Sequence, residues 1–316
     1  MGPSVGWHQK RALVTGASGF IGGYLITRLS ALGAHVYASE SPPDGLTRSE
    51  PDGEQAVSRL TFDVRNTRAV REAVRNINPH VVFHLAAVGV TNRDIEPWSA
   101  LMVNVGGVVN LLEALRGSNV ERVILTGTSY EYGACGATKE LDPFNAYSAS
   151  KVAAWAFGHM YWRAHQVPVV TVRPFQVYGP GQPGRTLVPS AIHAALSGED
   201  FPMTPGEQMR DFVFAEDVAG GMITIAETEG IEGERLDLGT GIGTPIRRVV
   251  EHIWSLAGAE GSMQPGALPY RSSAAMHLVA DAERTSQLSG WRATTPLVEG
   301  LKATMVHVRS QMRETV

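Results

Sequence analysis

A tyrosine and a lysine lie four residues apart in the segment Tyr147-Ser148-Ala149-Ser150-Lys151. Four residues make about one helical turn, so the phenol and the ammonium are expected on one face of a helix. The segment Asn145-Ala146-Tyr147 follows Pro143, which predicts that the helix begins there. A free phenol ionises only near pH 10, and a neighbouring ammonium favours the phenolate. The pair therefore predicts proton exchange by a tyrosine near neutral pH.

A glycine-rich segment near the N-terminus predicts the partner for this chemistry. Gly16-x-x-Gly19-x-x-Gly22 follows an apolar run and opens a helix-like stretch, the context in which such a motif binds a dinucleotide. Gly16 permits a tight turn, Gly19 leaves room for the pyrophosphate, and Gly22 lets the helix approach the sheet. The free N–H groups of the helix N-terminus attract phosphate. Together the two motifs predict a nicotinamide enzyme that moves a hydride and a proton.

Three further segments lie at expected strand ends. Glu40 follows Gly22 by 18 residues, where an acid binds the adenosine ribose hydroxyls and repels a 2′-phosphate. It predicts NAD rather than NADP. Asp63-Val64 ends the third expected strand, where an acceptor suits the adenine amino group. The small residues of Leu85-Ala86-Ala87 end the fourth and would let a cofactor approach the backbone.

These motifs require a parallel sheet to position them. Short apolar runs alternate with helix-like segments, which predicts an α/β fold with a doubly wound parallel sheet covered on both faces. We expect strands at 12–15, 35–39, 59–62, 81–85, 122–126, 169–173 and 235–238, and helices near 20–32, 67–77, 98–116 and 145–165.

The regular alternation ends after Arg173. Residues 174–184 are rich in proline and glycine and predict a loop that leaves the sheet. Ligands of open α/β sheets bind at the carboxyl ends of the strands. We therefore expect a cofactor-binding domain formed by residues 1–173 and 212–244, and a smaller substrate-binding region formed by 174–211 and 245–316.

Composition narrows the classes of partner. The net charge of −4 favours neither nucleic acid nor an anionic membrane. The single cysteine, Cys135, cannot form an intramolecular disulfide, which fits a reducing compartment. Residues 1–9 lack the apolar stretch of a signal peptide, and the apolar run 81–90 is too short to span a bilayer. The histidines show no metal-ligand spacing. We expect a cytoplasmic protein without a metal.

Three more motifs carry a family resemblance. They are Thr126-Gly127-Thr128-Ser129-Tyr130-Glu131-Tyr132-Gly133 on the expected fifth strand, Arg173-Pro174-Phe175-Gln176-Val177-Tyr178-Gly179-Pro180-Gly181, and Arg210-Asp211-Phe212-Val213-Phe214-Ala215-Glu216-Asp217-Val218. With the two motifs above, the chain resembles the extended short-chain dehydrogenase/reductase family over most of residues 11–300. The resemblance implies a Rossmann fold, NAD as cofactor and a nucleotide-diphosphate sugar as substrate.

The resemblance also implies roles for single residues. Thr128 would hydrogen-bond the substrate oxygen that becomes a ketone, Tyr147 would exchange its proton, and Lys151 would hold the nicotinamide ribose. Asn104 matches a family asparagine that helps to position the active site. The expected cofactor-binding residues are Gly16, Ser18, Gly19, Phe20, Ile21, Gly22, Glu40, Asp63, Val64, Leu85, Ala86, Ala87, Asn104, Thr126, Tyr147, Lys151, Pro174 and Val177.

Substrate contacts are implied in the same way. Arg210 matches the family arginine that binds the substrate diphosphate, Arg271 is a looser match for a second phosphate ligand, and Gln176 stands where many relatives have asparagine. Val188 is expected near the nucleotide base. The expected substrate-binding residues are Thr128, Ser129, Tyr130, Gln176, Val188, Arg210 and Arg271.

A departure from the family pattern bears on the reaction. Related sugar 4,6-dehydratases follow the catalytic threonine with Asp-Glu, whereas this chain has Ser129 and Tyr130, neither of which replaces a carboxylate as acid or base. Glu131 is one position further on, and strand alternation would turn it away. We expect an NAD-dependent nucleotide-sugar epimerase acting at C4 through a transient 4-keto sugar. The alternatives are an NAD(P)H-dependent reductase of a nucleotide-linked 4-keto-6-deoxy sugar, a uronic-acid decarboxylating enzyme and a non-catalytic cofactor-binding scaffold.

The family also implies a homodimer whose interface contains the helices near 98–116 and 145–165. Their apolar side chains fit this interface, although burial within one subunit is equally consistent with the pattern. These side chains are Val105, Val108, Leu112, Val152, Trp155 and Phe157.

Overall fold

The computed structural model describes residues 6–41, 57–91, 95–135, 140–270 and 275–314 of the chain. They form two compact units. The first comprises Met1–Thr128, Asn145–Arg173 and Ala219–Leu236, and the second Ser129–Phe144, Pro174–Val218 and Asp237–Val316. The units are defined by contacts, so the expected division into cofactor-binding and substrate-binding parts stays a prediction.

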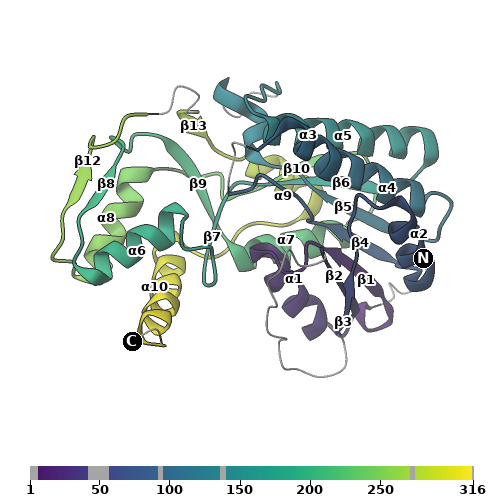
Figure 1. Ribbon diagram of the computed structural model, residues 1–316, viewed down its shortest axis with the longest axis horizontal. Helices are drawn as coiled ribbons and strands as arrows, with labels where there is room; N and C mark the ends of the chain where they lie inside the picture. The colour runs from purple at the N-terminus through teal and green to yellow at the C-terminus, as the bar shows by residue number, and fades with distance from the viewer. Residues whose placement is uncertain (1–5, 42–56, 92–94, 136–139, 271–274, 315–316) are drawn as a thin grey trace. The chain divides into compact units, whose positions relative to one another are not determined.

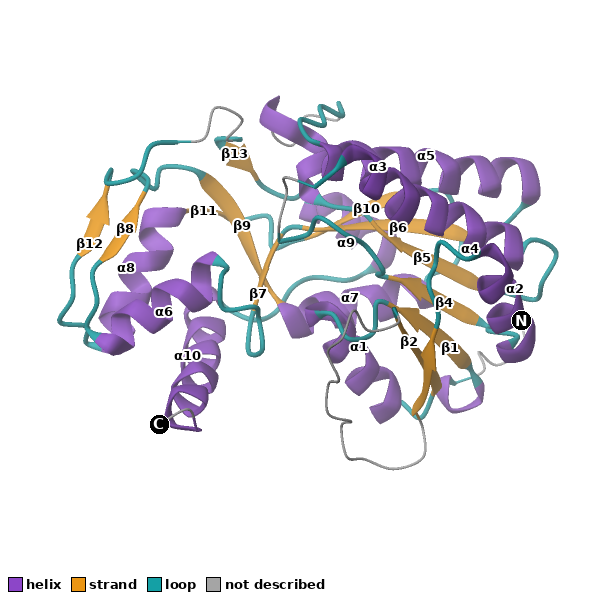
Figure 2. Cartoon of the chain, viewed as in Figure 1, coloured by secondary structure: helices purple, strands orange, loops and turns teal. Residues whose placement is uncertain are grey.

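A seven-stranded parallel sheet forms the centre of the first unit (Figures 1 and 2). Its spatial order is β10-β6-β5-β4-β1-β2-β3, so the strand order reverses between β1 and β4, as in doubly wound dinucleotide-binding sheets. This confirms the predicted fold class. The strands are β1 (Arg11–Thr15), β2 (His35–Glu40), β3 (Val57–Thr61), β4 (Val81–His84), β5 (Arg122–Thr126), β6 (Val169–Pro174) and β10 (Arg235–Leu238).

Helices cover both faces of this sheet (Figure 2). On one face α2 (Thr67–Ile77), α4 (Gly107–Leu115) and α5 (Ala146–His165) pack side by side. On the other lie α1 (Phe20–Ala31) and α7 (Ala215–Glu227). Buried side chains of β1, β4, β5, α2, α4 and α5 form one hydrophobic core, which fixes the strand ends that carry the predicted site.

The expected helix near 98–116 is interrupted. It consists of α3 (Pro97–Ala100), a π-helical turn (Leu101–Gly106) and α4. Among the described residues, this stretch is long and apolar enough to cross a membrane by length and composition alone. It packs against α2 and α5, and the core helix of a folded domain passes the same test.

The second unit has its own core. In it β9 (Met209–Phe214) pairs with β7 (Gln176–Tyr178), β11 (Gly243–Pro245) and β13 (His277–Leu278), while β8 (Phe201–Met203) pairs with β12 (Met263–Pro265). The helices α6 (Leu187–Ser197), α8 (Ile246–Ala257) and α10 (Leu297–Glu314) pack together, and α9 (Ala282–Ser289) follows β13. Tyr178 is fully buried, and its hydroxyl donates to the Leu297 carbonyl at 3.1 Å.

Two local predictions were wrong. The fifth strand ends at Thr126, and Ser129–Cys135 forms 3₁₀ turns that break at Gly133, where φ is +59°. Strand alternation therefore does not govern Glu131, which is fully buried. Residues 174–184 were expected to be loop throughout, but Gln176–Tyr178 forms β7, which pairs in parallel with β9 of the second unit.

Candidate active site

The N-terminus of α5 places Tyr147 and Lys151 on one face. Asn145 caps the helix: its Oδ1 accepts from the Ser148 N–H at 2.8 Å, and its own N–H donates to Ser148 Oγ at 3.2 Å. This reciprocal capping fixes the first turn two residues before Tyr147. The helix therefore begins where the sequence predicted.

The two side chains are buried together. Tyr147 is 6% exposed and Lys151 5% exposed, and the ammonium lies 5.9 Å from the centroid of the phenol ring. Lys151 Nζ donates to the Thr126 carbonyl at 2.8 Å, which anchors the ammonium at the end of β5. Thr128, two residues beyond Thr126, is 6% exposed in the same unit.

Asn104 lies in the π-helical turn and links this helix to the segment after β4. Its Oδ1 accepts from the Val88 N–H at 2.9 Å, and its Nδ2 donates to the Val88 carbonyl at 3.1 Å and to Ser150 Oγ at 2.8 Å. Ser150 Oγ donates in turn to the Tyr147 carbonyl at 2.7 Å. One buried amide thus fixes Val88 against the first turn of α5. Sequence reasoning missed Ser150, although it stands within the Tyr-x-x-x-Lys motif.

The glycine loop fits a bound pyrophosphate. Gly16 has φ of +70°, and a Cβ there would meet the Ala86 nitrogen at 2.6 Å, so only glycine fits between β1 and β4. A Cβ on Gly22 would meet the Gly16 and Ala17 carbonyl oxygens at 2.7 Å. A Cβ on Gly19 would meet only the Gly16 carbonyl oxygen, at 3.1 Å, so it would project into space that an anion can occupy.

The start of α1 offers its N–H groups to the same space. Gly19 caps the helix without a side-chain hydrogen bond, and Ser18 and Gly19 are exposed while Phe20 and Ile21 are half-buried. Helix N-termini of this kind attract phosphate. The residues present therefore fit the pyrophosphate of a dinucleotide.

The two acids expected to contact the cofactor each carry an arginine partner. Glu40 ends β2, and its Oε1 accepts from Arg59 Nη1 of β3 at 2.9 Å. Asp63 lies two residues beyond β3 and pairs with Arg65, which lowers the pKa of the Asp63 carboxyl below its usual value mainly through the side-chain hydrogen bond. Val64, its neighbour, is 5% exposed in the core.

The end of β4 combines half-buried small residues with a buried histidine. Leu85, Ala86 and Ala87 are half-buried. His84 is 2% exposed, and its Nδ1 lies 2.8 Å from Thr15 Oγ1. Burial, with a smaller contribution from the Lys151 charge, lowers the pKa of His84 to about 3, so the ring is neutral at physiological pH. The histidine supports the strand end in a role the sequence did not assign.

The residues predicted to bind substrate, other than Thr128, belong to the second unit, as do Pro174 and Val177. Arg210 is 9% exposed and donates to the Met209 and Ala275 carbonyls at 2.8 and 2.7 Å. Ser129 is buried, whereas Tyr130, Gln176 and Val177 are half-buried and Pro174 is buried. Arg271 lies outside the described residues.

Val188 is 1% exposed and packs in the core of the second unit, so the structure does not place it on an accessible surface. Sequence reasoning also passed over Asp211, which is fully buried beside Arg210. Its carboxylate accepts from the N–H groups of Thr240 and Gly241, both at 2.8 Å, and from Ala280 N–H at 3.2 Å. Its position within the Arg210-Asp211 motif was the available signal.

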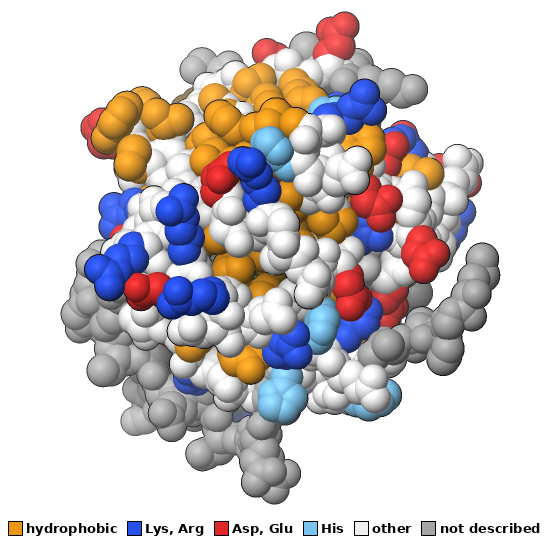
Figure 3. Space-filling model, turned by 90° about the vertical axis from the view of Figure 1, so that its right-hand side faces the viewer, with side chains coloured by type: hydrophobic (Ala, Val, Ile, Leu, Met, Phe, Trp, Pro, Cys, Tyr) orange, Lys and Arg blue, Asp and Glu red, His pale blue; other side chains and the backbone are white. Residues whose placement is uncertain are grey.

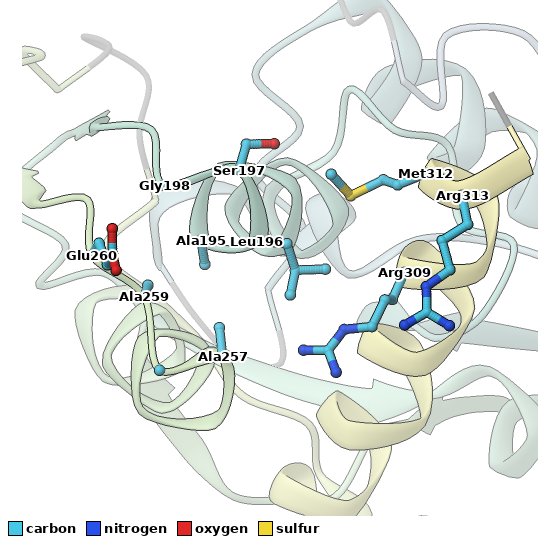
Figure 4. A pocket seen from close by; sticks show the side chains of 11 residues that line it. Ala195, Leu196, Ser197, Gly198, Ala257, Ala259, Glu260, Arg309, Met312 and Arg313 are labelled. Carbon is cyan, nitrogen blue, oxygen red and sulfur yellow. The ribbon is translucent and has the colours of Figure 1, made fainter. Parts of the chain in front are cut away.

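A cavity of about 710 Å³ lies elsewhere in the second unit (Figure 4). It opens between the C-terminal ends of α6 and α8 and the last turns of α10, where Arg309, Met312 and Arg313 lie. None of the predicted site residues lines it. Most of the residues predicted for cofactor binding and catalysis in the first unit lie instead at or just after the ends of β1, β4 and β5 and on α5.

The sheet order and the glycine loop define a dinucleotide-binding protein of the Rossmann class. The sequence model of the NAD dependent epimerase/dehydratase family matches residues 12–239, which is more than two thirds of the chain. The chain therefore belongs to this family.

Comparison with known proteins agrees with this assignment. The chain is 31% identical to a UDP-glucose 4-epimerase of Mycolicibacterium smegmatis, over 95% of this chain and 99% of the relative. Other matching relatives are named as a dTDP-D-glucose 4,6-dehydratase and a UDP-N-acetyl-alpha-D-glucosaminuronate decarboxylase.

Solved structures give the same picture. A UDP-glucose 4-epimerase of Thermotoga maritima with UDP-glucose superposes with a TM-score of 0.87 at 23% identity, covering 96% of this chain and 99% of its own, and shows the shared fold. A UDP-glucose 4-epimerase of Thermus thermophilus in complex with NAD is 28% identical with a TM-score of 0.82, covering 95% and 99%.

Proposed function

We propose that this protein is an NAD-dependent 4-epimerase of a nucleotide-diphosphate sugar. The observation that carries the proposal is the buried Tyr147–Lys151 pair on α5, in the same unit as Thr128 and the glycine loop. NAD complexes among the structural neighbours and the NAD-dependent family support NAD as the cofactor.

The residues of the first unit divide the chemistry between them. Bound NAD supplies reversible hydride removal at the sugar C4. Gly16, Gly19 and the start of α1 hold the pyrophosphate, and Lys151 orients the nicotinamide ribose. Tyr147 takes the proton from the 4-hydroxyl while Thr128 hydrogen-bonds the same oxygen. After the 4-keto sugar has rotated in the site, hydride would return to the opposite face of C4 and set the opposite configuration there, while Tyr147 gives the proton back to the 4-oxygen.

The substrate class rests on the relatives and on one arginine. The matching 4-epimerases are named for UDP-sugars, which carry a diphosphate. A guanidinium suits that group because it donates several parallel N–H bonds. We assign this role to Arg210, whose orientation is fixed by the two backbone carbonyls that it contacts.

The chemistry beside Thr128 distinguishes the family's reactions. Water elimination from the sugar requires an acid and a base, and Ser129 and Tyr130 supply no carboxylate where related dehydratases carry Asp-Glu. Epimerisation needs only Tyr147, Thr128 and the cofactor. Because Glu40 favours NAD, which is regenerated in each turnover, we prefer the epimerase to a ketoreductase that consumes NADPH.

A product assay tests the proposal. Purified protein is incubated with UDP-, dTDP-, GDP- and CDP-sugars while the product and the reduced-nicotinamide absorbance are followed. A 4-epimer formed without a steady absorbance change supports the epimerase. Steady consumption of added NADPH with a 4-keto-6-deoxy sugar would establish the reductase instead.

We further propose a homodimer, with an interface on α3, the π-helical turn and α5. Five large apolar side chains of these elements are exposed by 39 to 69%, namely Trp98, Leu101, Met102, Phe157 and Met160. Hydrophobic side chains gather toward the top of the face drawn in Figure 3, the side on which α4 and α5 lie in Figure 1. Exposed apolar surface of this kind marks interaction sites.

The sequence-based interface list needs a correction. Val105, Val108 and Leu112 are at most 5% exposed because they face the core of their own subunit, so they cannot form the contact. Light scattering of the wild type and of Trp98→Asp tests the dimer. The wild type should have the mass of two chains at micromolar concentration and the variant that of one, whereas a monomeric wild type would refute it.

A further inference from the structure

Glu40 and Arg59 form a charge pair beside the glycine loop. Thr15 of β1 pairs with Ser39 of β2, and the Ala17 N–H donates to the Ser39 carbonyl at 3.1 Å. Glu40, the next residue, therefore ends its strand next to the loop. Its carboxylate contacts Arg59 at 2.9 Å, with the two side chains 31% and 40% exposed.

The strand register brings Arg59 to this place. Ala38 is opposite Arg59 and Glu40 is opposite Thr61, so Glu40 and Arg59 lie two positions apart on the same face of the sheet. β3 is the edge strand of the sheet, which leaves the guanidinium accessible from solvent. The pair is thus part of the surface at which an adenosine ribose meets the end of β2.

The two charges act in opposite directions on a 2′-phosphate. A carboxylate at the end of β2 hydrogen-bonds the ribose hydroxyls of NAD and repels the phosphate of NADP, whereas an arginine nearby accommodates that phosphate. An exposed ion pair contributes little to stability, so its arginine is readily redirected to a stronger phosphate partner.

We infer that Arg59 tunes the cofactor preference: it limits the discrimination against NADP that Glu40 imposes, and among the described residues of β2 and β3 it is the arginine that a 2′-phosphate would meet. The inference rests on the proposed NAD site. It implies that removal of the Glu40 charge lets the site bind NADP, because the arginine that would bind the 2′-phosphate is already in place.

A binding cycle tests this inference without catalysis. Dissociation constants of NAD and NADP are measured by calorimetry for the wild type, Glu40→Gln, Arg59→Met and the double variant after removal of resident cofactor. Arg68→Met is the matched control, because Arg68 is an exposed arginine on α2 paired with Glu72 and lies outside the predicted site.

The wild type should bind NAD more tightly than NADP. Glu40→Gln should tighten NADP binding by about tenfold or more, since an arginine–phosphate contact is a charge-assisted hydrogen bond. In the double variant this gain should shrink to less than about threefold. Arg59→Met alone should weaken NADP several-fold while NAD changes little, and Arg68→Met should leave the ratio unchanged.

Two results distinguish failure of this inference from failure of the proposed function. If the wild type binds NAD but Glu40→Gln gains NADP affinity equally with and without Arg59, or Arg59→Met behaves like Arg68→Met, the inference is overturned and the proposed function stands. If the wild type binds neither dinucleotide, both are overturned.

Discussion

Gly89 lies against the side chain of Tyr147, and its replacement by alanine tests whether the position of that phenol limits turnover. Gly89 has φ of +87° and follows Val88, whose N–H and carbonyl are held by Asn104. A Cβ at this position would lie 2.6 Å from Ile95 Cδ1 and 3.2 Å from both Cβ and Cδ2 of Tyr147. These distances are shorter than ordinary carbon contacts, so neighbouring groups must move.

The size of the effect on stability and on kcat depends on which neighbouring group moves. The positive φ costs an alanine about 1–2 kcal/mol of stability. The end of the Ile95 side chain can rotate away, but Cβ of Tyr147 moves only with the first turn of α5. That turn is held by the Asn145 cap and by Ser150. A shift of about 0.3 to 0.5 Å in the phenol should lower kcat by about fourfold to tenfold, since a 1 Å displacement costs about a hundredfold.

The chain supplies a matched control. Gly117 has φ of +73°, and a Cβ there would meet no atom within 4 Å. Gly117→Ala therefore introduces the same backbone strain without a steric contact. Steady-state kinetics, NAD affinity and thermal unfolding are measured for Gly89→Ala and Gly117→Ala. Both should lose stability, Gly89→Ala the more because of its added steric contacts, and only Gly89→Ala should lose turnover, with NAD affinity unchanged within threefold.

A double variant separates the two contacts. Gly89→Ala combined with Ile95→Val removes the Cδ1 atom and should recover part of the stability but not kcat. The reasoning fails if Gly89→Ala turns over as fast as Gly117→Ala, because the phenol would then tolerate the displacement. It also fails if relief at Ile95 restores kcat, which would place the strain outside Tyr147.

Three other variants probe the same site. Tyr147→Phe should keep NAD bound and slow turnover by about 10² to 10⁴, and near-normal turnover would exclude Tyr147 as the acid–base group. Ser150→Ala should cost about 1 kcal/mol in thermal stability and lower kcat several-fold, because Asn104 Nδ2 and the Tyr147 carbonyl lose a partner; an unchanged kcat would limit Ser150 to a structural role. The depressed pKa of His84 means that the folded state disfavours its protonation, so stability is retained above pH 6.5 and lost as pH falls toward 3, by about 1.4 kcal/mol per pH unit. In melting curves at pH 7.5 and 5.5, His84→Gln should therefore lose less stability on acidification than the wild type, and equal losses would contradict the assignment.

The sequence predicted well whatever depends on local pattern. The seven strands of the sheet were predicted from apolar runs because a doubly wound sheet buries short continuous segments, and the helices near 20–32, 67–77, 98–116 and 145–165 were predicted between them, whereas α7 was missed. The start of α5 was predicted from Asn145 and Pro143 because helix capping is a matter of a few adjacent residues. The glycine loop was predicted from its spacing, although Gly16 is constrained by the backbone of Ala86, which lies outside the motif.

Features set by distant backbone were predicted less well. The segment after Thr128 looked like a continuing strand, yet the Gly127 N–H makes its bond to the Val172 carbonyl and the chain then turns into 3₁₀ geometry. The π-helical turn at Leu101–Gly106 had no signal in the apolar pattern, because a π turn shifts the register by one residue without changing composition. It nevertheless carries Asn104, the amide that joins Val88 to Ser150.

The preference for NAD or NADP could not be predicted in full from single residues of the sequence. Glu40 was recognised from its distance along the chain to the glycine motif, and by itself it favours NAD. Arg59 is separated from it by 19 positions and meets it only because β2 and β3 pair in one particular register. A shift of that register by one residue would turn Arg59 to the opposite face and leave Glu40 unscreened. The charge that a dinucleotide meets at this strand end is therefore a property of the two paired strands. Substitutions on either strand should change the preference for NAD over NADP.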